Sequence, residues 1–105
     1  MTLILHPAAK RDLLELTKFF FEIDPALGNK FDARVDHYLR LIRQSPALFH
    51  EGKFGIRRVN LAPTLQAYFI AYFCRNDTTV VLAIGHAKRR PYYFRDRIDE
   101  AREML

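Results

Sequence analysis

The dipeptide Asp24-Pro25 divides the first half of the chain into two amphipathic segments, and no other motif limits the possible folds as strongly. Apolar residues recur at helical steps before it, at Ala9, Leu13, Leu16, Phe20 and Ile23. A second helical stripe follows it, at Leu27, Phe31, Val35, Tyr38 and Ile42. Asp is a favoured N-cap and proline is tolerated at the first helical position, so the second helix starts here. Two helices with so short a connection are predicted to form a hairpin.

Proline also marks the outer ends of this hairpin. The short, partly β-branched segment Thr2–Leu5 predicts an opening strand, and His6-Pro7 predicts the start of the first helix. The second helix is expected to end before Ser45-Pro46. Gly28 and Asn29 weaken its first turn and leave its starting residue open.

The second half of the chain changes to a strand periodicity. Ile56–Leu61 is followed by turn residues at 62–64, and residues from Leu65 to Cys74 alternate with a period of two. After a turn at 75–78, Thr79–Ile84 is the most strand-like segment of the chain. A short C-terminal helix is expected last, with one face formed by Phe94, Ile98, Ala101 and Leu105.

These elements predict a single α+β domain over residues 1–105. Consecutive strands with short turns pair antiparallel, so an N-terminal strand, a helical hairpin and a three-stranded meander complete one mainly antiparallel sheet. The helices are expected on one face of it. No apolar run approaches the roughly 20 residues that cross a bilayer, so we expect no membrane partner. The one cysteine, Cys74, is predicted to pack within its strand, and a lone thiol fits the cytoplasm.

Positive charge is concentrated in the second half of the chain. The whole sequence has a formal net charge of +5, whereas residues 53–97 hold nine Lys and Arg against two acidic residues, a net charge of +7. Such an excess is either a solvated surface or a face that binds nucleic acid or an acidic protein.

A basic and aromatic cluster follows the last predicted strand, from His86 to Arg95. Cations neutralise phosphates and aromatic rings stack on unpaired bases, so the cluster suits single-stranded RNA or DNA. The cations around His86 favour its neutral form, which would let it accept a proton. Alternatively, Tyr92, Tyr93 and Phe94 pack beneath the last helix and the cations are solvated.

Arg57 and Arg58 are adjacent on a predicted strand and therefore point to opposite faces of the sheet. If the exposed one shares a face with Arg89, the two form a concave basic patch, which Lys53 would extend. Such a patch suits a metal-independent ribonuclease, which needs a base, cations for the pentacovalent phosphate and an acid. The spacing of the histidines and the lone cysteine predicts no metal site, and we expect no cofactor.

The complete ordered set of motifs resembles the RelE/ParE superfamily of toxins from bacterial type II toxin–antitoxin modules, often labelled plasmid stabilisation proteins. The resemblance is carried by Ala8–Leu13, Asp24-Pro25, Ser45-Pro46, Gly55–Val59, Ala67–Tyr72 and Ile84–Tyr93. It implies a toxin that a cognate, usually acidic, antitoxin holds inactive, and it leaves a homodimer open.

The resemblance implies two mechanisms. RelE-like members cleave mRNA on the ribosome without metal, and this is the function that the sequence predicts. Arg57 and Arg89 would then hold the phosphate, while His86 or the Tyr92–Tyr93 pair would transfer protons and stack. The predicted catalytic residues are Arg57, His86, Arg89 and Tyr92, and the predicted RNA-binding residues are Lys53, Arg58, Lys88, Arg90 and Tyr93. ParE-like members instead inhibit DNA gyrase by binding it, which is the alternative.

Overall fold

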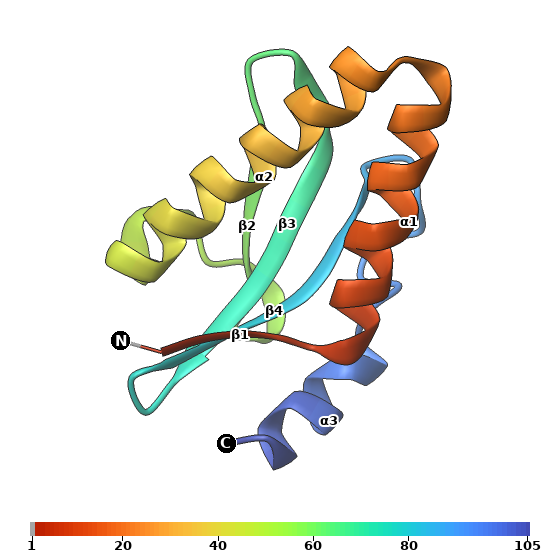
Figure 1. Ribbon diagram of the computed structural model, residues 1–105. Coiled ribbons are helices and arrows are strands. Elements are labelled where there is room, and N and C mark those ends of the chain that lie inside the picture. Colours follow the sequence, from red (N-terminus) through yellow and green to blue (C-terminus); the bar gives the residue numbers. More distant parts are fainter. Residues whose placement is uncertain (1) are drawn as a thin grey trace.

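A computed structural model describes residues 2–105, and its helices and strands follow the predicted order (Figure 1). They are β1 (Thr2–Leu5), α1 (Pro7–Ile23), α2 (Pro25–Gln44), β2 (Arg57–Leu61), β3 (Leu65–Arg75), β4 (Thr78–His86) and α3 (Asp96–Glu103). The sheet has four strands in the order β1-β4-β3-β2, in which β1 runs parallel to β4 and the other pairs are antiparallel. The predicted α+β class is confirmed. None of the helices described in residues 2–105 is long and apolar enough to span a bilayer.

Side-chain caps fix both helices of the hairpin. The Nδ1 atom of His6 accepts a hydrogen bond from the Ala8 N–H at 2.9 Å, directly before α1. Asp24 ends α1 by donating its N–H to the Phe20 carbonyl at 3.0 Å, and its side chain begins α2 by accepting the Ala26 N–H at 3.1 Å. One residue therefore serves as the last cap of one helix and the first cap of the next.

Gly28 lies in the first turns of α2 because the two helices approach closely there. A Cβ atom at this position would overlap the ring of Phe21 in α1. The glycine that weakens the predicted helix start is therefore required by the packing of the hairpin.

The hairpin covers one face of the sheet and forms the larger part of the core. Side chains of Phe20, Phe31, Val35 and Ile42 from the helices pack against the sheet residues Leu61, Ile70, Tyr72, Val81 and Ile84. The hydroxyl of Tyr72 donates to the Pro46 carbonyl at 2.6 Å, and burial raises the pKa of Tyr72 to about 12. This hydroxyl therefore stays a donor and ties the loop after α2 to β3.

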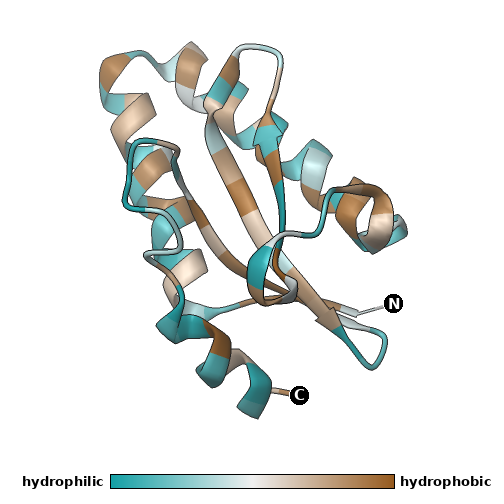
Figure 2. Ribbon diagram, turned by 180° about the vertical axis from the view of Figure 1, so that it is seen from behind, coloured by the Kyte–Doolittle hydropathy of each residue, from teal (hydrophilic) through white to brown (hydrophobic). Residues whose placement is uncertain are grey.

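The opposite face of the sheet is covered in part by α3 and the segment before it, near the C-terminus in Figure 2. Phe94, Ile98 and Ala101 pack there against Phe69 and Leu82. The expectation that all helices share one face is therefore wrong for α3. The uninterrupted buried run from Thr79 to Gly85 in β4 explains why, because a strand that is apolar on both sides needs cover on both.

Cys74 also differs from its prediction, because it is exposed rather than packed. It lies one residue from the end of β3, beyond Phe73, which is the last buried residue of the strand. Its Sγ atom is 3.3 Å from the hydroxyl of Thr79 on the neighbouring strand.

A side-chain ion pair completes the edge of β4 where β1 ends. β1 pairs with β4 only as far as Val81. Beyond that point, Asp12 of α1 accepts the Ile84 N–H at 3.2 Å, and Arg97 of α3 donates to the Leu82 carbonyl at 2.8 Å. The two side chains also pair with each other at 2.7 Å, and they are only 13% and 19% exposed respectively. Asp12 and Arg97 thus replace a missing strand and join both layers of helices to the sheet.

We predict that Arg97→Ala lowers the free energy of unfolding by about 2–4 kcal/mol. The substitution leaves the largely buried Asp12 carboxylate without its cation and the Leu82 carbonyl without its side-chain donor. Urea unfolding measures the loss. The control is Arg102→Ala in the same helix, whose exposed pair with Asp99 spans 4.0 Å and is expected to contribute less than about 0.5 kcal/mol. Equal losses for the two variants would contradict this role of Arg97.

Candidate functional site

Two aromatic rings on the α3 side of the sheet gather three arginine side chains. The rings of Phe69 in β3 and Tyr93 before α3 have centroids 6.5 Å apart. Arg58 of β2 stacks on Phe69, with its Cζ atom 3.9 Å from the ring centroid. Arg89 stacks on Tyr93 at 3.8 Å, and Arg97 lies 5.8 Å from the same ring. Residues from β2, from the loop after β4 and from α3 therefore form one basic cluster, which we call the stacked-arginine cluster (Arg58, Arg89 and Arg97).

Tyr93 is the structural centre of this cluster. Its hydroxyl is buried and has no hydrogen-bond partner in the described part of the chain. Burial raises the pKa of Tyr93, the Asp12 carboxylate adds to this effect, and the neighbouring arginines oppose it. The phenol therefore stays protonated at neutral pH. It serves as a platform for guanidinium groups rather than as a proton acceptor.

The structure separates Arg57 from the residues with which it was predicted to act. Arg57 lies on the face of the hairpin, donates to the Phe49 carbonyl at 2.7 Å and is 3.7 Å from Glu51. It shares this side of β2 with Val59 and Leu61, which belong to the hairpin core. Arg58, rather than Arg57, is the strand arginine that lies on the same ring pair as Arg89. Alternation along the strand shows that the two arginines diverge, but not which of them faces Arg89.

His86, the last residue of β4, borders the hairpin. Its Nδ1 atom accepts the Lys88 N–H at 2.9 Å, and its ring lies nearly perpendicular to the ring of Tyr68, with the two centroids 4.8 Å apart. Because Nδ1 accepts this hydrogen bond, the neutral ring carries its proton on Nε2 and presents a donor there. The side chain lines a cavity of about 330 Å³ together with Asp12, Glu15 and Arg89. His86 thus faces carboxylates of α1, and Arg89 contributes to both this cavity and the stacked-arginine cluster.

A cavity of about 500 Å³ lies beside Arg58, on the α3 side of the sheet. Tyr92 and Phe94 form part of its wall, and His50 and Asn60 contribute polar groups. Sequence reasoning missed both polar residues. Asn60 had a signal, since it lies two residues after Arg58 and shares its face of β2. His50 lies in a loop, where no periodicity indicates a direction. We call this cavity the His50 cavity.

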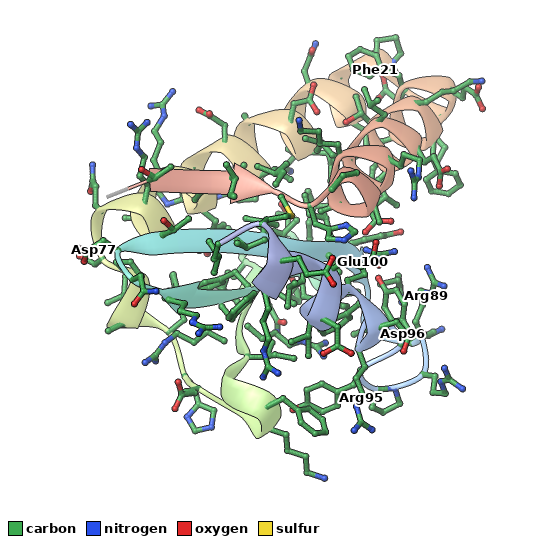
Figure 3. All side chains as sticks on the ribbon, turned by 90° about the horizontal axis from the view of Figure 1, so that it is seen from below. Phe21, Asp77, Arg89, Arg95, Asp96 and Glu100 are labelled. Carbon is green, nitrogen blue, oxygen red and sulfur yellow. The ribbon has the colours of Figure 1, made fainter. Side chains whose placement is uncertain are left out.

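Three predicted RNA-binding positions line a third cavity of about 380 Å³, which is smaller than the His50 cavity. It is lined by Lys53, Arg90, Tyr93 and Arg95, and it shares Tyr92 with the His50 cavity. We call it the basic cavity. Figure 3 shows Arg89 and Arg95 at the end of the molecule away from Asp77. Lys88 is exposed nearby, and its backbone holds His86.

Within residues 2–105, no three His, Cys, Asp or Glu side chains are grouped as metal ligands.

The sequence model of a known family, described as the ParE toxin of the type II toxin-antitoxin system, parDE, matches residues 3–91. The chain belongs to this family. No curated protein gives a match to the sequence. The resemblance to RelE/ParE toxins is thereby confirmed, and the protein is a toxin of a type II toxin–antitoxin system. Membership implies an antitoxin as the toxin's partner. The matched region includes Arg58, His86 and Arg89.

We predict that Tyr93→Phe stabilises the toxin by about 1 kcal/mol, because it removes a buried hydroxyl that has no hydrogen-bond partner in residues 2–105. Gly85→Ala should cost about 1–3 kcal/mol, because the new Cβ overlaps that hydroxyl. In the Tyr93→Phe background this cost should fall, since the nearest remaining ring atom would be 3.3 Å away. Thermal unfolding of the double-mutant cycle measures the coupling. Additive effects would show that the two positions do not meet.

Proposed function

We propose that the toxin cleaves mRNA on the ribosome and that Arg58 and Arg89 hold the scissile phosphate. The observation that supports this function is the convergence of the two side chains on the Phe69–Tyr93 pair. Attack of a 2′-hydroxyl on phosphorus forms a 2′,3′-cyclic phosphate and breaks the bond from phosphorus to the 5′-oxygen, while the hydroxyl proton passes to water. Negative charge builds up on the phosphate oxygens during this step. Guanidinium groups that are already in position stabilise this charge in the transition state.

Stacking leaves the charges of these two arginines available. Among the described residues, neither Arg58 nor Arg89 forms an ion pair, whereas Arg57 pairs with Glu51 and Arg97 pairs with Asp12. A ring beneath a guanidinium restricts its motion and leaves the N–H groups at its edge free to donate. The two arginines are therefore ordered cations that form no ion pair with any carboxylate in residues 2–105.

Tyr92 is the proton donor that we propose for the leaving oxygen. Its hydroxyl oxygen accepts the Lys53 N–H at 3.3 Å, so its own proton remains free to be donated. The side chain lies between the His50 cavity and the basic cavity. Arg57 and His86, which the sequence predicted as catalytic, lie on the hairpin side and have no part in this proposal.

We predict that Arg58→Ala and Arg89→Ala each reduce mRNA cleavage by about 10²–10³-fold, because each removes one donor to the charged transition state. Primer extension on translated messages after induced expression measures the cleavage. Arg11→Ala and Arg75→Ala, which alter exposed arginines on α1 and at the end of β3, are the matched controls. Antitoxin binding and circular dichroism should show that all four variants are folded. Cleavage at the unaltered rate in both cluster variants would rule out the phosphate role.

Gyrase inhibition is the second candidate, and an exposed apolar stripe on α1 favours it. Phe19 and Ile23 are four residues apart on one face of the helix and are 50% and 60% exposed. Ile23 was predicted to be part of the buried stripe, yet it is available for a partner. The description of the family as ParE toxin agrees with this candidate, because the resemblance to ParE-like toxins implies inhibition of gyrase by binding.

For this candidate, Phe19→Ser/Ile23→Ser should relieve inhibition of plasmid supercoiling by about tenfold or more, since both apolar contacts are lost. The control is Leu48→Ser, which alters an apolar side chain that is 58% exposed after α2. Relaxed plasmid together with intact messages would support gyrase inhibition. Cleaved messages with normal supercoiling would support the ribonuclease.

A further inference from the structure

The His50 cavity has the size and lining of a site for a small planar molecule. Its volume of about 500 Å³ falls within the range of roughly 300–1,000 Å³ that is typical of ligand pockets. Phe49, Tyr92 and Phe94 supply aromatic surface, while Arg58 connects the cavity to the stacked-arginine cluster. A planar group that enters the cavity therefore lies next to the proposed phosphate site.

Two exposed polar residues in the lining of this cavity have side chains that are available to bind a ligand. His50 and Asn60 line it, and neither side chain is hydrogen-bonded to any part of the chain that the structure describes. An amide both donates and accepts, and a neutral imidazole does the same through its two nitrogens. These are the groups that recognise the edges of nucleobases by hydrogen bonding.

The basic cavity on the other side of Tyr92 offers the opposite chemistry. Lys53, Arg90 and Arg95 surround it, with Asp96 as the one acidic residue in its lining. Ring contacts support the shared wall: the rings of Phe54 and Tyr92 are nearly perpendicular with centroids 5.6 Å apart, and the Cζ atom of Arg95 lies 4.6 Å from the centroid of Phe54. A largely apolar cavity with two hydrogen-bonding side chains, His50 and Asn60, thus adjoins a cationic cavity.

The backbone of this wall is held in a costly conformation. Phe54 and Tyr92 have φ angles of 63° and 55°, in the left-handed region that favours glycine. Each such residue costs about 1 kcal/mol or more and persists only where its surroundings hold it. Here the Lys53 N–H donates to the Tyr92 hydroxyl at 3.3 Å. This hydrogen bond fixes Tyr92 to the loop that contains Phe54.

We propose that the His50 cavity binds one nucleobase of a single-stranded RNA, that His50 and Asn60 read its edge, and that the adjoining phosphate lies in the basic cavity. The alternation of an apolar and a cationic cavity matches the alternation of base and phosphate along a single strand. This inference rests on the proposed ribonuclease function for the class of substrate. It adds two specificity-determining residues that take no part in the cleavage chemistry.

Binding of short, non-cleavable 2′-O-methyl RNA to the purified full-length toxin tests the inference. Fluorescence anisotropy compares oligonucleotides that carry each of the four bases, or an abasic site, at one position. The unaltered toxin should prefer one base over the abasic strand by about tenfold. His50→Ala and Asn60→Ala should remove this preference and leave the affinity for the abasic strand unchanged. His37→Ala, an exposed histidine on α2, is the matched control and should preserve the preference.

Cleavage on ribosomes provides the second readout. His50→Ala should broaden the set of codons that are cut without lowering the total rate of cleavage. A different result separates the two proposals. If the two variants lose the base preference in the binding assay but no form of the toxin cleaves messages, the ribonuclease proposal is overturned and the base site is preserved. An unchanged codon set and unchanged base preference in both variants would overturn the base site. So would a loss of antitoxin affinity in these variants with RNA binding intact, since the cavity would then hold a protein side chain.

Discussion

The ion pair between Asp12 and Arg97 determines how the two halves of the toxin fit together. A strand edge with unpaired backbone groups is normally covered by another strand, but β1 ends too early to cover all of β4. The pair supplies one acceptor and one donor to that edge, at Ile84 and Leu82. Because Asp12 belongs to α1 and Arg97 to α3, the same contact fixes the C-terminal segment that carries Tyr93. The position of the stacked-arginine cluster therefore depends on an ion pair that one of its own members, Arg97, makes with the helical hairpin.

Most of the architecture can be predicted from the sequence, because the signals are local. Asp24 and the prolines at 7, 25 and 46 set the helix ends, and the change from helical to alternating periodicity marks the sheet. The prediction fails where long-range packing decides. The side of the sheet that α3 covers depends on β4 being buried on both faces.

The candidate site was predictable in part, and for the same reason. Alternation shows that Arg57 and Arg58 diverge, whereas the choice between them depends on which face the hairpin covers. His86 was identified from its charged neighbours, yet its ring is held by the Lys88 N–H and faces α1. His50 lies in a loop without periodicity, so its place in a cavity is visible only in three dimensions.

The stacking of Arg58 and Arg89 on aromatic rings also has a consequence for timing. Side chains that already hold their working geometry need no rearrangement when a target arrives. An antitoxin that masks such a surface has to block access to it rather than distort it. A toxin that is released from its antitoxin therefore needs no rearrangement of these two side chains.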